Sequence, residues 1–223
     1  MAFSSSAIAV EQSGNFKEFE VRVIRPRYFQ KRGSFELGVK GMTITNQTFI
    51  YTFLGSLSLG YHFSESLGVE FFGASGNSIL KRDTEILAEE FDINTQILRT
   101  QSLYAANMLW TPMYGKYQLS SGRVVYFDTA LSVGLGVTGI GYVFDHCSVA
   151  RDEQRRAAHT SQYATFSIGL GQRYYMNEFS ALRWDLRSYI FNSDVRDGSC
   201  VEDPTASAEY SQQNNLTIEL GYS

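Results

Sequence analysis

The fold is decided by two alternating segments that a short turn joins. The first segment is Gln162–Tyr175 (QYATFSIGLGQRYY) and the second is Ala181–Phe191 (ALRWDLRSYIF), with MNEFS between them. Apolar residues recur at every second position in both segments, and a period of two is the side-chain period of a β-strand. The pair therefore predicts a β-hairpin.

The two faces of this hairpin differ in chemistry. In the first arm Phe166, Ile168 and Leu170 share one face, while small residues and Arg173 share the other. The charged face of the second arm is made by Arg183, Asp185 and Arg187. A soluble sheet buries its apolar face and leaves its charges in water, whereas a transmembrane barrel turns apolar side chains to lipid and polar ones to its lumen.

The composition favours a membrane barrel. The 223 residues fit one all-β domain or two small ones. They include 14 Tyr, 16 Phe and 19 Gly, and only 19% of them are charged, which suits aromatic girdles and small inward residues. No apolar run reaches the roughly 18 residues of a transmembrane helix, and a net charge of -4 provides no electrostatic footprint for nucleic acid.

The same alternation recurs along most of the chain. It predicts eight strands, at 34–43, 50–63, 67–75, 102–110, 123–137, 162–175, 181–191 and 215–222. None of these segments contains Pro, which would interrupt a hydrogen-bonded ladder, and Thr111–Lys116 is predicted as a turn.

The connections between the predicted strands alternate in length. Those after the second, fourth and sixth strands are compact, while those after the third, fifth and seventh strands, at 76–101, 138–160 and 193–213, are long and polar. Bacterial outer-membrane barrels have short periplasmic turns, long outside loops and both chain ends in the periplasm. The pattern therefore predicts an all-β fold, an eight-stranded antiparallel up-and-down transmembrane β-barrel.

A soluble lipocalin-type barrel has the same number of strands, and the charges on one face decide between the two. Alternation places nine charged side chains in the lumen of the membrane barrel: Glu36, Lys40, Glu70, Asp128, Arg173, Arg183, Asp185, Arg187 and Glu219. In a soluble barrel the aromatic rows would instead fill a lumen that has room only for side chains. Buried charges must pair, so we expect a charge network that plugs the lumen, with a narrow ion path as the alternative.

The N-terminal region is predicted to lie outside the barrel. Residues 1–15 are expected to be disordered or to be the remnant of a signal peptide, because Phe3–Ala9 ends in a cleavage-like Ala-Ile-Ala. Residues 16–33 are basic and are predicted to form a periplasmic lead-in that packs on the barrel mouth. Residues 34–223 are assigned to the outer-membrane β-barrel.

No residue set predicts catalysis or metal binding. His62 falls on the inner face, where a hydrogen-bonding role in the lumen is expected. His146 and His159 share one outside loop, but they lack the three or four ligands of a zinc site and a fixed nucleophile–base pair. We therefore expect no catalytic residue, no metal, no cofactor and no enzyme activity.

The two cysteines are candidates for a disulfide. Cys147 and Cys200 fall in two neighbouring outside loops, and an even, sparse count of cysteines is compatible with one bridge in an oxidising compartment. Two free thiols are the alternative.

Several motifs together resemble a known family. They are Phe29–Leu37 (FQKRGSFEL), Trp110–Lys116 (WTPMYGK), Gly169–Tyr175 (GLGQRYY) and Ala181–Arg187 (ALRWDLR). Over about residues 20–222 the chain resembles the myxobacterial-type outer-membrane β-barrel family. The resemblance implies an outer-membrane protein of the Gram-negative cell envelope, in a family whose members mostly lack an assigned activity. Some relatives are linked to gliding-motility complexes, but no motif here marks that role.

We expect a closed structural anchor or interaction protein of the bacterial outer membrane, with N- and C-termini in the periplasm. Its expected partners are the lipid bilayer and an envelope or surface protein that contacts the extracellular loops or the lead-in, with no nucleic acid. The barrel is expected to be monomeric or a component of a larger complex. A small narrow pore is the first alternative, and a lipid-active outer-membrane enzyme is the second.

Overall fold

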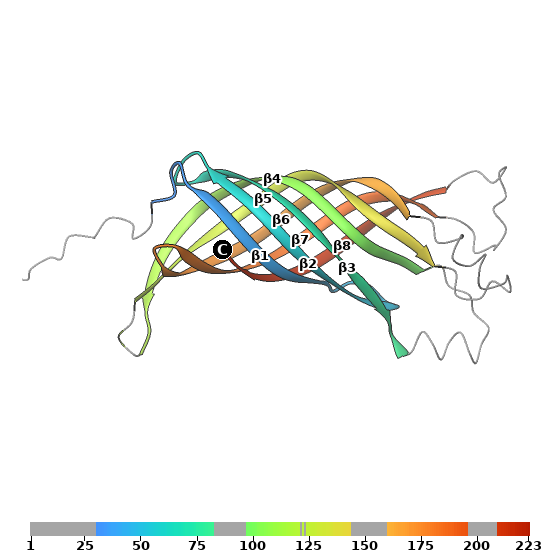
Figure 1. Ribbon diagram of the computed structural model, residues 1–223, viewed down its shortest axis with the longest axis horizontal. Helices are drawn as coiled ribbons and strands as arrows, with labels where there is room; N and C mark the ends of the chain where they lie inside the picture. The colour runs from blue at the N-terminus through green and yellow to red at the C-terminus, as the bar shows by residue number, and fades with distance from the viewer. Residues whose placement is uncertain (1–29, 83–96, 121, 123, 144–159, 196–208) are drawn as a thin grey trace, which may run out of the picture.

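The computed structural model is a closed ring of eight antiparallel strands (Figure 1). It describes residues 30–82, 97–120, 122, 124–143, 160–195 and 209–223. The strands are β1 (Phe35–Ile44), β2 (Ile50–His62), β3 (Leu67–Leu80), β4 (Ile97–Gln118), β5 (Val124–Val143), β6 (Thr160–Asn177), β7 (Ser180–Val195) and β8 (Glu209–Tyr222). Each strand pairs with the next in chain order, which confirms the predicted up-and-down barrel.

The ring closes where the first strand meets the last. β1 and β8 share six residue pairs, from Val39↔Tyr222 to Ile44↔Thr217, which is the shortest ladder of the barrel. Asn46, just past β1, continues this seam, because its side chain donates to the carbonyl of Asn214 at 2.6 Å and accepts from the amide of Leu216 at 2.9 Å.

The two ends of the barrel differ. One end, called here the turn end, carries the described turns Ser64–Ser66 and Glu178–Phe179 and the end of β8 at Tyr222. At the opposite end, called here the loop end, β3, β5 and β7 stop before the long connections. The turn end lies on the left of Figure 1 and the loop end on the right.

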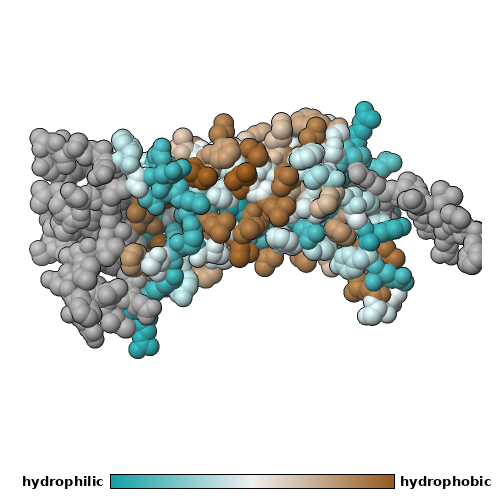
Figure 2. Space-filling view, turned by 180° about the vertical axis from the view of Figure 1, so that it is seen from behind, coloured by the Kyte–Doolittle hydropathy of each residue, from teal (hydrophilic) through white to brown (hydrophobic). Residues whose placement is uncertain are grey.

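Alternation in the strands separates an apolar outer surface from a polar interior. Outward side chains such as Leu37, Phe71 and Leu135 are largely exposed, with accessible fractions of 75%, 58% and 71%. Figure 2 shows hydrophobic side chains gathered over the middle of one face of the barrel and hydrophilic ones towards its two ends. This inside-out arrangement is the one that a transmembrane barrel requires.

Aromatic side chains mark the border of the apolar belt at the turn end. The rings of Phe35 and Tyr61 lie 4.9 Å apart, and those of Tyr61 and Phe63 lie 5.1 Å apart. Trp110 and Tyr222 are exposed near the same end. Aromatic rings are amphipathic and suit the boundary between lipid and water.

Several strands are longer than alternation predicts. β3 continues from Ser75 to Leu80, and β4 begins at Ile97 rather than Ser102. The prediction of a turn at Thr111–Lys116 was wrong, because these residues continue β4. A bulge between Trp110 and Met113 accommodates Pro112 there, as bulges do for a residue that cannot donate to the ladder.

No helix among the described residues is long and apolar enough to cross a membrane.

Candidate functional site: the charged lumen

The nine charged residues that alternation directs inward all lie inside the barrel. Eight of them are buried, and the Glu36 side chain is 18% exposed at the turn end. We call this set the lumen charge network: Glu36, Lys40, Glu70, Asp128, Arg173, Arg183, Asp185, Arg187 and Glu219.

Glu70 of β3 connects two opposite walls of the barrel. Its carboxylate accepts hydrogen bonds from Nη1 of Arg183 and from Nη2 of Arg187, the latter at 2.6 Å. Both arginines are on β7, which stands four strands away from β3 in a ring of eight. The guanidinium–carboxylate pairs therefore span the full width of the lumen.

Lys40 of β1 forms a second centre of ion pairing. Its Nζ lies 3.0 Å from Oε2 of Glu219 and 3.1 Å from Oδ2 of Asp185. Glu219 also accepts a hydrogen bond from the hydroxyl of Tyr189 at 3.0 Å. Asp185 lies 2.7 Å from Nε of Arg183, so the two centres share their partners.

A third group of charges lies nearer the turn end. Glu36 is 2.8 Å from Nε2 of His62 and 3.0 Å from Nη1 of Arg173. His62 is buried on the inner face and interacts with another lumen side chain, as its place in the alternation predicts.

One member of the interior was missed by sequence reasoning. Lys31 precedes β1 and was assigned to the lead-in, but its side chain is buried and pairs with Asp128, which also accepts a hydrogen bond from Tyr175. Burial, together with the positive charge of Arg173, lowers the pKa of the Lys31 ammonium to about 8. No alternation precedes Ser34 strongly enough to direct Lys31 inward, so its only signal was proximity to the barrel mouth.

Lys31 also balances the charge of the interior. The predicted network has four basic and five acidic residues, and Lys31 adds the fifth base. With Lys31 the described network has equal numbers of both signs, so each buried charge can have an opposite partner, which buried ions need.

An apolar layer covers the network on the side of the loop end. Going towards that end, the inward residue after Lys40 is Met42, the one after Glu70 is Phe72, and the one after Arg187 is Tyr189. These residues belong to one buried cluster, which comprises Met42, Ile44, Leu54, Phe72, Ala74, Leu103, Ala105 and Tyr189. The Arg187 guanidinium lies 5.5 Å from the centre of the Phe72 ring. The lumen is thus filled by charges and then by apolar groups along its axis.

Glycines on the inner face make room for the long charged side chains. Gly171 pairs with Asp185 and Gly169 pairs with Arg187 across β6 and β7. A Cβ atom on Gly169 would lie 2.5 Å from Cγ of Arg187, and one on Gly171 would overlap the Asp185 carboxylate. The close approach explains why small residues alternate with large ones there.

Some buried donors have no hydrogen-bond partner among the described residues. They include Nε and Nη2 of Arg173, Nη2 of Arg183, and Nε and Nη1 of Arg187. These five guanidinium nitrogens are therefore not used by the hydrogen bonds of the network.

The remaining predicted residues cannot be placed. His146, His159, Cys147 and Cys200 lie outside the described residues, and the disulfide stays a prediction. Within the described part of the chain, no three His, Cys, Asp or Glu side chains are grouped so that they could hold a metal ion.

Comparisons with known proteins give a likeness of fold. The solved structures that are similar to this chain include three whose matches each cover at least 85% of its length. The outer membrane protein OprG of Pseudomonas aeruginosa has 14% identity and a TM-score of 0.48, with 87% of this chain and 96% of that one covered. Ail, the attachment invasion locus protein of Yersinia pestis, has 12% identity and a TM-score of 0.40, with 86% and 97% covered.

The third similar structure is a major outer membrane protein from Thermus thermophilus, with 12% identity, a TM-score of 0.41, and 85% and 98% covered. No family model matches the chain, and no curated protein matches it. The resemblance to the myxobacterial-type family therefore stays a prediction, and the barrel itself rests on the strand pairing and on the chemistry of its two surfaces.

Proposed function

We propose that this protein is an integral outer-membrane barrel that acts as a closed structural anchor or interaction protein. The apolar outer belt and the inward charges support its place in a bilayer. Long connections at one end and short turns at the other are typical of bacterial outer-membrane barrels. In this proposal the turn end and both chain termini face the periplasm, and the loop end faces outwards.

The observation that carries the proposed closure is the set of ion pairs from Glu70 to Arg183 and Arg187 across the lumen. An eight-stranded barrel has an interior just wide enough for side chains. Charged pairs that join opposite walls, followed by the apolar layer of Met42, Phe72 and Tyr189, oppose the passage of hydrated ions. The lumen then serves stability, and the loops and the part of the lead-in that precedes Lys31 are left to contact an envelope or surface partner.

The experiment is ion conductance in planar bilayers, with heat-modifiable gel mobility as the control for folding. We expect folded wild-type protein to be silent. A variant that shortens the residues of the apolar layer, Phe72→Ala with Tyr189→Ala, is the matched comparison, because it removes side chains from the lumen and leaves the outer belt unchanged. Stable, reproducible channels of wild-type protein would contradict the closed anchor.

A small narrow pore is the second candidate, and one observation favours it. The unused guanidinium N–H groups of Arg173, Arg183 and Arg187 could line a hydrated path, since they offer donors within the lumen. Such a pore would prefer anions, so the conductance experiment includes the reversal potential in a salt gradient. A lipid-active enzyme would need a His–Ser or His–Asp pair at the rim of the barrel. The two loop histidines of this chain, His146 and His159, lie outside the described residues.

A further inference from the structure

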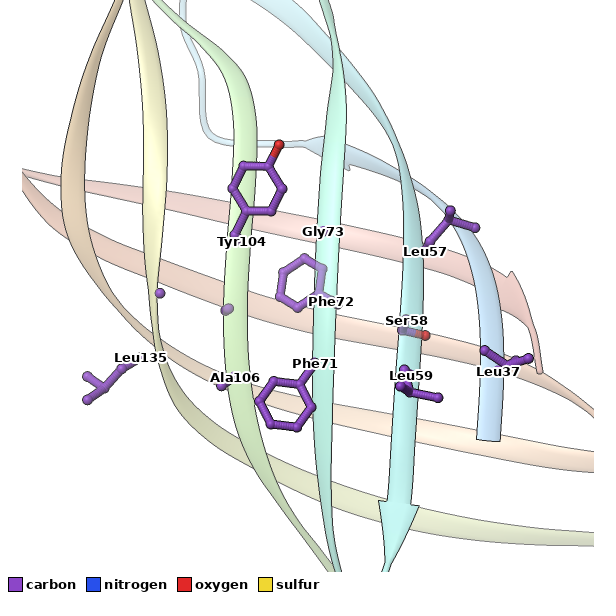
Figure 3. A pocket seen from close by; sticks show the side chains of 12 residues that line it. Leu37, Leu57, Ser58, Leu59, Phe71, Phe72, Gly73, Tyr104, Ala106 and Leu135 are labelled. Carbon is purple, nitrogen blue, oxygen red and sulfur yellow. The ribbon is translucent and has the colours of Figure 1, made fainter. Parts of the chain in front are cut away.

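A groove lies on the outer wall of the barrel, across β2, β3 and β4 (Figure 3). Its volume is about 550 Å³, which falls in the range of roughly 300–1,000 Å³ that small ligands occupy. The outward side chains that surround it are Leu37, Leu57, Leu59, Phe71, Tyr104 and Leu135.

The hollow arises because two small outward residues are framed by large ones. Gly73 pairs with Leu57 on one side and with Tyr104 on the other. Ala106 pairs with Phe71 and Leu135 in the same way. The Tyr104 ring leans over Gly73, since a Cβ there would lie 3.0 Å from Cδ1 of that ring.

A second glycine site on the same wall shows the contrast. Gly55 also faces outwards, but its neighbours in register are Gly41 and Ser75. A Cβ at Gly55 would meet nothing within 4 Å. Small residues alone therefore make a flat patch, and the groove needs the walls around Gly73 and Ala106.

The position of the groove indicates what fills it. It is continuous with the apolar belt, and its residues lie between the middle of the strands and the aromatic border at Phe35, Tyr61 and Trp110. A second copy of the chain is a poor occupant, because a symmetric dimer needs a self-complementary patch and about 800 Å² of contact per partner. A concave site with projecting rims instead suits a slender, flexible hydrocarbon.

We infer that this groove holds one acyl chain of a phospholipid from the leaflet on the side of the turn end. The inference rests on the proposed place of the barrel in a bilayer. The bound chain lies on Ala106, beside the rings of Phe71 and Tyr104. It exchanges more slowly than the lipids over the rest of the belt, because it contacts protein on more than one side.

The test is photolabelling of the folded wild-type barrel in phosphatidylethanolamine vesicles. These contain a small share of a phosphatidylethanolamine with a diazirine in its acyl chain. After irradiation, labelled peptides are mapped by mass spectrometry. We expect labelling around Phe71, Tyr104 and Ala106 to exceed, several-fold, the labelling around Ile168 and Ile218 on the opposite wall. Labelling in simple proportion to exposed apolar area would overturn the inference.

Two variants separate the groove from the surface in general. Ala106→Phe fills the hollow and should abolish the excess labelling, whereas Gly55→Phe adds the same ring to the flat patch and should leave it unchanged. Equal effects of both variants, or dimer cross-links through this wall in place of lipid adducts, would contradict a lipid site. A chain that fails to insert into the vesicles, judged by heat-modifiable mobility, would contradict the proposed function itself.

Discussion

At the residue scale, Arg187 shows how strongly the interior depends on complete pairing. Its guanidinium is buried and donates to Glu70 at 2.6 Å. Replacing Arg187 by Ala leaves that carboxylate with one guanidinium fewer in a closed interior. We expect a loss of about 3–5 kcal/mol in the free energy of unfolding, the cost of breaking a buried ion pair from one side.

Urea unfolding in detergent micelles, followed by tryptophan fluorescence, measures this loss. Arg32→Ala is the control, because Arg32 is exposed at the turn end and surface changes usually stay within about 0.5 kcal/mol. Equal stability of Arg187→Ala and wild type would mean that the ion pairs across the lumen contribute nothing.

The buried Lys31 ammonium is expected to make the stability of the protein depend on pH. Its pKa in the folded protein is about 8, below the ordinary 10.5, so the unfolded chain binds more protons between these two values. The contribution of Lys31 to the free energy of unfolding is therefore absent below about pH 8, and it rises with pH until about pH 10.5. Relative to Lys31→Met, wild type should gain up to about 3 kcal/mol over this window.

The measurement is the difference in the free energy of unfolding between wild type and Lys31→Met at several pH values. The contributions of the other titrating groups cancel in this difference. A difference that stays flat from about pH 7 to pH 10.5 would show that Lys31 is hydrated rather than buried against Asp128.

At the scale of the element, alternation predicts where the strands lie but not where they end. The middle of β6 is clear because Phe166, Ile168 and Leu170 face lipid and their neighbours face the lumen. Past the apolar belt the residues of both faces become small or polar, as in Ser75–Ser78 of β3, and the apolar period of two disappears while the hydrogen bonds continue. Pro112 concealed the continuation of β4 for a different reason, since a bulge admits it.

The two faces of β6 can be tested along the strand itself. Ile168→Arg places a charge in the middle of the apolar belt and should reduce the free energy of folding into vesicles by about 2–4 kcal/mol. Gln162→Arg is on the same face near the loop end and should cost about 0–1 kcal/mol. Folded fractions from heat-modifiable mobility distinguish them, and normal insertion of Ile168→Arg would show that the faces are reversed.

The glycines between β6 and β7 give a second prediction for this element. Gly171→Val pushes a side chain into the Asp185 carboxylate and should lower stability by about 1–3 kcal/mol, as overpacking does. Gly55→Val adds the same group to open surface and serves as the comparison in the same unfolding assay. A stable Gly171→Val protein would mean that the interior has spare room.

At the scale of the whole molecule, the content of the lumen was only partly predictable. The alternation along each strand places all nine charges inside the barrel, and it also directs Met42, Leu54 and Phe72 inwards. No role was predicted for these three residues, because the general rule that apolar residues face lipid conflicts with their place in the alternation. The apolar layer was therefore missed. Lys31 was missed because it precedes the first strand, where alternation cannot assign a residue to a face. Only the folded barrel brings it to Asp128.

The predicted bridge between Cys147 and Cys200 also concerns the whole molecule. The connections that contain these cysteines follow β5 and β7, which both end at the loop end. Closing a loop of this length is worth roughly 4 kcal/mol in the entropic account. We expect unreduced and reduced protein to migrate differently on denaturing gels, and Cys147→Ser to abolish the difference. Identical migration of both forms would indicate free thiols.

The short seam between β1 and β8 has a consequence for the order of folding. Its two strands lie at opposite ends of the barrel sequence, and contacts so distant in sequence have the largest loop-closure cost. Lys40 on β1 and Glu219 on β8 meet only when this seam forms. The Lys40–Glu219 ion pair therefore cannot guide the early steps of assembly. It is made at the moment of closure, and it acts afterwards to keep the finished barrel from reopening.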